Sequence, residues 1–411
     1  MRKLFIILLT IGFVNTTSFA QFATNRDRFT DSTLQLNTIT TAVPFLLITP
    51  DSRAGAMGDA GVAMSADANS IHWNPAKLAF VDKEMGFAIS YAPWLRQLVP
   101  DINLSYLSGF KRLDDMSTLA ASLRYFSLGD ITFTDNVGNT IGQFRPNEFA
   151  LDVAYGRKLA DNFSGGIALR YIYSNLTGGI SANGTATTAG NSVAVDVSGF
   201  YNNQDMEILG KDGGFAAGIN ISNIGAKMSY TENAQKDFIP INLRMGQSTT
   251  IRFDDYNSLS FLLDFNKLLV PTPPQYLRDS ATGALVYDSN GEKIISKGRS
   301  SNVSVASGMF GSFSDAPEGF KEELREFNIS AGMEYWYNKL LALRMGYFNE
   351  HITKGNRKYL TFGAGLRLSV FGLDIAYLVA TTQQNPLANT IRFTLSFNFD
   401  DFKKQNKDTN E

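Results

Sequence analysis

The sequence predicts an all-β membrane protein, a 14-stranded antiparallel transmembrane β-barrel that follows an N-terminal plug segment. Three observations predict it. From about residue 85, apolar and polar residues alternate with a period of two, which is typical of strands with one apolar face. The alternating segments run for about ten residues, the length that a tilted membrane-spanning strand needs. Aromatic residues gather near the ends of the apolar faces, as they do in the interfacial girdles of outer-membrane barrels.

The last expected strand shows the alternation most clearly. Its apolar face carries Ile391, Phe393, Leu395, Phe397 and Phe399, and its polar face carries Thr390, Arg392, Thr394, Ser396 and Asn398. Bacterial single-chain barrels have an even number of strands. We therefore expect fourteen, at residues 85–92, 102–109, 117–127, 149–156, 162–174, 191–201, 214–224, 239–251, 258–266, 327–337, 340–349, 359–369, 371–381 and 389–399.

Barrel loops are short on the periplasmic side and long outside. Counting back from a periplasmic C-terminus, the tight connections at Asn338-Lys339 and Val370 are periplasmic, and residues 267–326 form one long extracellular loop. The apolar residues 303–309 resemble a fifteenth strand, but the even count assigns them to this loop. Within it, residues 287–292 predict a hairpin with an Asn-Gly turn, and residues 318–326 a short helix. Residues 400–411 are expected to be a polar periplasmic tail.

Composition excludes several other classes of protein. The chain has 411 residues, of which 18% are charged and 12% aromatic, and a mean hydropathy of -0.10. Spanning helices need about 20 consecutive apolar residues, so a helical membrane protein is excluded. The chain has no Cys and only two His, which excludes disulfides, thiolate or multi-His metal sites, Cys nucleophiles and a lipoprotein anchor. The net charge of -2 gives no reason to expect nucleic-acid binding, and no cofactor is expected.

The segments before the first strand have other roles. Residues 1–20 have the basic, apolar and small-residue regions of a secretory signal peptide, with cleavage before Gln21. Residues 21–84 lack the alternation and are rich in small residues, which permit close backbone packing. We interpret them as a plug in or under the lumen. Its expected motif residues are Gly58, Asp59, Trp73, Asn74, Pro75 and Ala76.

Eleven of the fourteen expected strands carry one charged residue on the polar face. They are Arg124, Asp152, Arg170, Asp196, Arg244, Asp264, Glu334, Arg344, Arg367, Asp374 and Arg392. Signs mostly alternate between neighbouring strands, and the planar guanidinium of Arg suits bidentate pairing with carboxylates. One interpretation is a network that fills the barrel and holds the plug. The other is a polar conduit, although the near balance of charge argues against a strongly ion-selective pore.

Catalysis has little support, so we expect no enzyme. A lipid hydrolase would need a base such as His72 in the plug motif or His351 beside Glu350, but a solvated loop histidine is the simpler interpretation. The glycine-rich residues 178–190 have no Lys and lack the order of a phosphate-binding loop.

Apolar residues in the outer loops are candidates for binding a partner or cargo. They are Trp94, Leu95 and Leu98 in the first loop, and Phe310, Phe313 and Phe320 in the long loop. Large apolar side chains at an aqueous surface often mark protein contacts. The alternative is that they fold back over the barrel and close it.

Two sets of motifs resemble known families. Gly58-Asp59-Ala60, Asp67-Ala68 and Trp73-Asn74-Pro75-Ala76 resemble the N-terminal motif of FadL-like barrels. The sequence over 310–324, and Glu334-Tyr335-Trp336-Tyr337-Asn338 with the sequence over 342–348, resemble the PorV family of the Bacteroidetes type IX secretion system. The resemblance spans essentially the whole mature chain.

The resemblance to PorV implies a non-enzymatic outer-membrane protein with a FadL-like barrel. It implies binding of the C-terminal signal domains of secreted cargo, association with the SprA (Sov) translocon barrel, and delivery of cargo to the PorU attachment complex. It also carries a link to lipid A deacylation. The alternative function is a FadL-type importer of hydrophobic molecules, which would need an apolar pocket. A purely structural barrel with no stable partner is a third.

Overall fold

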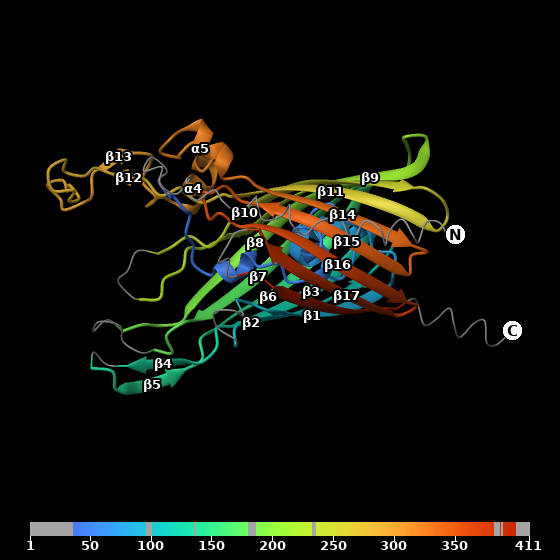
Figure 1. Cartoon of the computed structure of the whole chain (residues 1–411), viewed down its shortest axis with the longest axis horizontal. Helices are drawn as coiled ribbons and strands as arrows, with labels where there is room; N and C mark the ends of the chain where they lie inside the picture. The colour runs from blue at the N-terminus through green and yellow to red at the C-terminus, as the bar shows by residue number, and fades with distance from the viewer. Residues whose placement is uncertain are drawn as a thin grey trace, which may run out of the picture.

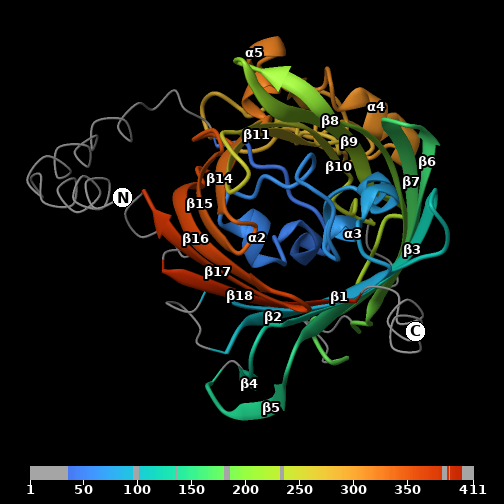
Figure 2. The same ribbon diagram turned by 90° about the vertical axis from the view of Figure 1, so that its right-hand side faces the viewer.

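Fourteen antiparallel strands form a closed barrel in the computed structural model (Figures 1 and 2). The structure describes residues 36–95, 101–134, 137–179, 186–231, 236–381, 387 and 389–399. The expected signal peptide and the expected C-terminal tail lie outside these residues. The predicted fold class and strand count are confirmed.

Each barrel strand pairs with its sequence neighbours in the barrel, and the first strand closes against the last. The barrel strands are β1 (Met85–Pro93), β2 (Asn103–Arg112), β3 (Ser117–Ser127), β6 (Asn147–Ala160), β7 (Phe163–Asn175), β8 (Gly190–Ile208), β9 (Lys211–Gly225), β10 (Asn242–Arg252), β11 (Asn257–Leu268), β14 (Asn328–Tyr337), β15 (Leu341–Asn349), β16 (Lys358–Leu368), β17 (Phe371–Ala380) and β18 (Thr390–Phe399).

Burial alternates along these strands as the sequence pattern requires. In β1, Phe87 and Ile89 are exposed on the outer surface, whereas Ala88 and Ser90 are buried inside. The outward residues form the apolar band that contacts lipid in a membrane barrel. The inward residues of β1 are small because another segment of the chain occupies the space between the walls.

The two ends of the barrel differ. At one end, here called the turn end, connections are short, and Asn338 and Lys339 both take positive φ in a tight turn closed by a hydrogen bond from Leu340 N to Tyr337 O of 3.0 Å. At the other, the loop end, lie the hairpin of β4 (Ile131–Thr134) and β5 (Thr140–Phe144) and the long loop (Figure 1). The sequence pattern did not predict the β4–β5 hairpin, which is too short to display a period.

The long loop contains two further strands and two helices. They are β12 (Gln275–Tyr276), β13 (Ile295–Lys297), α4 (Val305–Gly311) and α5 (Phe320–Arg325). Residues 303–309, assigned above to the loop rather than to a fifteenth strand, are largely helical. Ser304 caps α4 by accepting a hydrogen bond from Ser307 N. The expected turn at Asn290-Gly291 forms, with Gly291 N donating to Asp288 O at 3.1 Å.

The N-terminal segment runs through the barrel interior and appears in blue inside the ring of strands in Figure 2. It contains α2 (Ser52–Gly55), α3 (Ser70–Trp73) and two 3-10 helices, Pro44–Leu47 and Pro75–Phe80. In the described part of the chain, no helix combines the length and the apolar character needed to cross a membrane.

Candidate functional site: the filled lumen and the loop end

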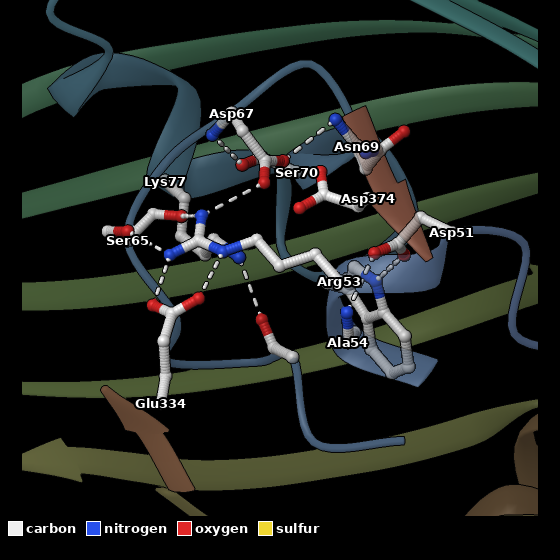
Figure 3. A network of polar contacts seen from close by, with 12 residues as sticks. Asp51, Arg53, Ala54, Ser65, Asp67, Asn69, Ser70, Lys77, Glu334 and Asp374 are labelled. Atoms are coloured by element: carbon white, nitrogen blue, oxygen red, sulfur yellow. Dashed lines mark hydrogen bonds and ion pairs between the residues drawn. The ribbon is translucent and has the colours of Figure 1, made fainter. Parts of the chain in front are cut away.

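The centre of the lumen is an ion-pair network between the N-terminal segment and the wall (Figure 3). Arg53 on α2 donates from Nε to Glu334 Oε2 at 2.9 Å and from Nη2 to Glu334 Oε1 at 2.7 Å. Its Nη1 also pairs with Asp67 Oδ2 at 3.1 Å. Arg53 and Glu334 are both buried. A bidentate, buried pair of this kind fixes orientation as well as position.

The wall extends this network on the other side of Glu334. Arg344 on β15 donates to Glu334 at 2.7 Å and to Asp374 on β17 at 2.8 Å, and Arg367 on β16 pairs with Asp374 at 2.6 Å. Four neighbouring strands, β14 to β17, are therefore joined inside the barrel by a continuous chain of ion pairs.

A second cluster lies across the lumen on β6, β7 and β8. Arg170 pairs with Asp152 at 2.6 Å and with Asp196 at 3.1 Å. Asn223, in a bulge of β9 with positive φ, donates from its backbone N to Asp196 and accepts a hydrogen bond from Arg170. The alternation gave no sign of Asn223, because a bulge breaks the period of two.

The remaining wall charges in the predicted set bind the N-terminal segment directly. Asp264 Oδ2 accepts hydrogen bonds from Gly61 N at 2.7 Å and Val62 N at 2.9 Å. Arg392 pairs with Asp59 at 2.8 Å. Arg124 and Arg244 donate to backbone oxygens of the segment, those of Leu46 at 2.7 Å and His72 at 3.1 Å. The eleven charges thus lie in two wall clusters and in contacts to the N-terminal segment.

The expected motif residues of the N-terminal segment are all in contact with the wall or with one another. Gly58 N donates to Thr361 Oγ1 at 2.8 Å, and Asp59 binds Arg392. Trp73 Nε1 donates to Asp51 Oδ1 at 2.7 Å. Asn74 caps the helix that Pro75 begins, accepting from Ala76 N at 3.0 Å, while its own amide donates to Gly199 O at 3.1 Å.

Glycines on the inner wall make room for this segment. A Cβ on Gly218 would lie 2.6 Å from Asn74 Nδ2, and one on Gly166 or Gly346 would overlap the backbone at Ala76 or at Met57 and Gly58. No side chain fits at these positions while the segment keeps its place. The wall and the segment are therefore complementary in shape as well as in charge.

Two lysines that are almost completely buried were missed by the sequence pattern. Lys77 of the N-terminal segment is fully buried and donates to Gly61 O at 2.7 Å. Lys267, at the loop end of β11, is also fully buried and pairs with Glu323 at 3.0 Å and with Glu326. Lys77 lies outside the strands, and Lys267 occupies one of the alternate positions of β11 that point out of the barrel. Neither therefore belongs to the inward-facing set of charges.

Helix α5 at the loop end has an unusual distribution of side chains. Glu322 and Glu323 are buried, whereas Phe320 is 74% exposed and Leu324 is 55% exposed. Lys354 pairs with Glu322 at 2.6 Å and with Glu326 at 2.9 Å, which joins the loop 350–357 to the helix. The helix is held by its charges and turns its apolar residues outward, the reverse of an ordinary surface helix.

Burial raises the pKa of one carboxyl in this cluster. Asp315 accepts a hydrogen bond from Thr272 N at 3.2 Å and lies near Glu323. Its burial, reinforced by the negative charge of Glu323, raises its pKa to about 6. Burial acts in the same direction on Glu322, but the hydrogen bond from Lys354 outweighs it and leaves the pKa of Glu322 below its ordinary value.

The predicted partner-binding residues fall into two groups. Trp94 and Leu95 are partly buried and pack against apolar clusters at the mouth of the barrel. Phe310, Phe313 and Phe320 are exposed, at 72%, 47% and 74%. The first loop thus folds back over the barrel at these two residues, whereas the long loop presents its aromatic residues. Leu98 lies outside the described residues.

A cavity of about 490 Å³ lies at the loop end of the lumen. Apolar side chains, among them Phe45, Ile48 and Phe126, line one part of it, and polar side chains, among them Arg244 and Glu350, line another. Arg244 also stacks on the Trp73 ring, 4.9 Å from its centroid.

Neither histidine lies in a catalytic arrangement within the described residues. His72 is buried, with Arg124 bonded to its Nδ1 and Arg244 to its backbone oxygen. His351 Nδ1 contacts Thr353 Oγ1 at 2.9 Å, while Glu350 pairs with Arg357 at 2.8 Å. In the part of the chain that the structure describes, no group of His, Cys, Asp and Glu residues could hold a metal ion.

Comparison with known proteins gives one family match. Residues 31–275 match the family described as "Type IX secretion system protein PorV". Similar solved structures include the toluene transporter TbuX of Ralstonia pickettii, with 10% identity, 85% of this chain and 98% of that chain covered, and a TM-score of 0.46. They also include a FadL homologue of Pseudomonas aeruginosa, with 12% identity, 89% and 100% covered, and a TM-score of 0.45.

No curated protein matches the chain. The matched residues 31–275 make up more than half of the chain and contain the N-terminal segment and the strands from β1 to β11. The chain therefore belongs to the PorV family of type IX secretion system proteins, which are non-enzymatic barrels of the bacterial outer membrane.

Proposed function

We propose that this barrel binds the C-terminal signal domains of secreted cargo at its loop end and hands them on within the secretion machinery. The loop end faces the outside of the cell, and the C-terminus faces the periplasm. The partners are the SprA (Sov) translocon barrel, from which cargo is received, and the PorU attachment complex, to which it is delivered. The N-terminal segment acts as a plug, so that no substrate passes through the lumen.

The observation that carries the cargo proposal is the reversed helix α5. Its carboxylates are held in buried pairs with Lys267 and Lys354, so the helix is fixed in place while Phe320 and Leu324 remain exposed. Exposing two large apolar side chains from an anchored helix is unfavourable in water and favours contact with a protein. Aromatic anchors supported by a rigid element are the usual centre of a binding surface.

The plug proposal is supported by the contacts inside the barrel. Three kinds of contact hold the N-terminal segment: ion pairs with Glu334 and Arg392, backbone hydrogen bonds donated to Asp264, and the close approach at inner-wall glycines. Interactions spread over β9, β11, β14 and β18 would have to break together for the segment to leave. We therefore assign the polar lumen residues to holding the plug and not to conduction.

Capture of cargo by variants tests the docking face. The double variant Phe320→Ser with Leu324→Ser should lose most of its capture of a purified cargo C-terminal domain, measured with the barrel in mild detergent. Leu209→Ser is the matched control, because Leu209 is 88% exposed at the turn end. Unchanged capture by the double variant, with normal barrel assembly, would contradict the assignment.

A second candidate function is import of hydrophobic molecules. The cavity of about 490 Å³, with Phe45, Ile48 and Phe126 in its lining, is the observation that favours it. An importer should bind a hydrophobic probe in this cavity and need no cargo domain. Affinity purification in mild detergent separates the two, because a secretion component co-purifies with its machinery and an importer does not.

A further inference from the structure

We propose that the outward face of β9, β10 and β11 is where this barrel docks laterally against the wall of another membrane-spanning protein. The proposal rests on the proposed function for the expectation that this partner belongs to the secretion machinery. It goes beyond that function in assigning a face of the barrel within the membrane, separate from the cargo surface at the loop end.

The first observation is a pair of polar side chains on the outer surface of β10. Arg244 points inward and binds His72, so Met245, Gln247 and Thr249 point outward on alternate positions. Thr249 Oγ1 donates to Gln247 Oε1 at 3.0 Å. The two side chains therefore form a small polar site on the surface that otherwise meets lipid.

The depth of Gln247 follows from the strand register. Directly paired residues form a row that starts at the turn end of β7 and ends near the loop end of β15. The row is Phe163, Tyr201, Ala217, Gln247, Leu263, Ala331 and Tyr347. Its two ends carry the aromatic residues that are typical of the membrane interfaces. Gln247 occupies the middle of the row and so lies near mid-depth.

A carboxamide at this depth is out of place against lipid. On the other described barrel strands, the outward positions between the aromatic rims carry apolar side chains or glycine, and Ser105 lies on the rim beside Tyr91 and Tyr125. Within the described residues, the Gln247 Nε2 group has no hydrogen-bond acceptor. Hydrocarbon chains offer none, and an unpaired amide there is unfavourable. A protein wall can supply the missing acceptor.

The second observation is that the long loop overhangs the same three strands. Val303, Val305 and Met309 pack in one apolar cluster with the outward residues Leu243 and Met245. Lys267, which also points outward, has the rings of Phe313 and Phe327 within 5.9 Å and 5.6 Å. Figure 2 shows α4 and α5 outside the ring of strands on this side.

The overhang and the polar pair define one docking face. Phe310 and Phe313 remain exposed along the edge of the overhang, and Gln247 and Thr249 lie below it on the same strands. The occupant that fits is an apolar transmembrane wall with an oxygen acceptor at mid-depth, whose upper edge packs against the two aromatic rings. Lipid would satisfy the rings but not the amide.

Site-specific photocrosslinking in cells with the intact secretion machinery tests this face. A photoreactive residue at Ala217 or Leu263, the direct neighbours of Gln247, should give an adduct with another outer-membrane protein of that machinery. The same residue at Leu151 or Leu169 is the control, since both are exposed on the outer surface of β6 and β7. Adducts of equal yield on both sides, adducts with a second copy of this chain, or adducts with lipid alone would overturn the proposal.

Substitution of the polar pair gives an independent readout. Gln247→Leu with Thr249→Val should reduce co-purification of that partner about tenfold, as expected for loss of one polar contact within a membrane. The isolated variant should be at least as heat-stable in detergent as the wild type, since an apolar residue suits the outer wall. Retained partner binding, or loss of barrel stability instead, would overturn the proposal. Capture of the isolated cargo domain should not change, which keeps this test separate from that of Phe320 and Leu324.

Discussion

Arg53 and Glu334 form a buried, bidentate ion pair although they lie 281 residues apart in the chain. The pair joins the N-terminal segment to β14, and Arg344 shares the same carboxylate. Removal of one partner from a buried pair leaves the other charge without compensation, which is more costly than the pair is worth in itself. Without Glu334, the two arginines keep only Asp67 and Asp374 as ion-pair partners, so the network retains one buried positive charge in excess.

Glu334→Gln should therefore destabilise the folded barrel by about 3–5 kcal/mol. The amide keeps the shape of the side chain but leaves Arg53 and Arg344 facing a neutral group. Denaturant unfolding in detergent micelles, followed by tryptophan fluorescence, measures the change. Glu318→Gln is the control, because the Glu318–Arg325 pair at 2.9 Å is partly exposed and should contribute less than about 1 kcal/mol. Equal stability of the two variants would contradict the central role of Glu334.

The inner-wall glycines predict how the lumen can be opened. Gly166→Ala should displace the N-terminal segment, because a Cβ there overlaps the backbone at Ala76, and overpacking of this kind costs about 1–3 kcal/mol. Single-channel recording in planar bilayers should detect conductance events in this variant and few in the wild type.

Gly165→Ala is the matched control for that experiment. Gly165 is the adjacent residue on the outward face of β7, and the closest contact of a Cβ there would be the flexible end of Leu159, at 3.2 Å, with the nearest backbone atom at 4.0 Å. It should behave like the wild type. Absence of conductance in the Gly166→Ala variant would contradict the close fit between the N-terminal segment and the wall. Stable conductance in the wild type would contradict the assignment of the segment as a plug.

The barrel itself could be predicted from the sequence because each strand records its environment locally. In β18, one face must meet lipid and the other the filled lumen, so the alternation of Phe393 and Leu395 with Thr394 is imposed residue by residue. The inward parity of Arg170, Asp152 and Asp196 follows from the same rule, and the observed pairs are between neighbouring strands.

The contacts of the N-terminal segment could not be predicted in the same way. Arg53 lies in a short helix with no periodic pattern, and its partner depends on how the segment threads through the closed barrel. Lys267 is on the outward parity of β11, where a charge is unexpected until the long loop is seen to cover it. The reversed helix α5 was predicted as a helix, but its sequence gives no sign that Glu322 and Glu323 are the buried side.

Asp315 predicts a pH dependence of the long loop. Its pKa of about 6 in the folded loop exceeds the ordinary value of 3.8, so the folded loop binds the proton more tightly than the unfolded loop. Its contribution to stability is then fully present below about pH 4 and is lost as the pH rises through about 6. Hydrogen exchange of the amides of α5 should be slower at pH 5 than at pH 7, after correction for intrinsic rates.

Asp315→Asn removes the titrating group and should abolish most of that difference between pH 5 and pH 7. Glu322 has the opposite sign, since its lowered pKa stabilises the loop above about pH 4.5 and the stabilisation is lost only at lower pH. Asp315 and Glu322 therefore change the stability of the loop in separate pH ranges. Persistence of the full difference in the Asp315→Asn variant would assign the pH dependence to another group.

Lys267 links the stability of α5 to cargo capture. Lys267→Met leaves Glu323 without its cation and Glu326 with Lys354 alone, so α5 should detach locally and capture of the cargo domain should fall. Unfolding of the barrel in denaturant should change little, because the cluster lies at the rim.

Lys321→Met, which replaces an exposed lysine on the same helix, is the control and should leave capture unchanged. Adding Glu323→Gln to Lys267→Met removes the uncompensated charge and should restore part of the loss, as a coupled pair requires. Normal capture by Lys267→Met, with α5 exchanging rapidly in hydrogen exchange, would show that cargo binding does not depend on an anchored helix.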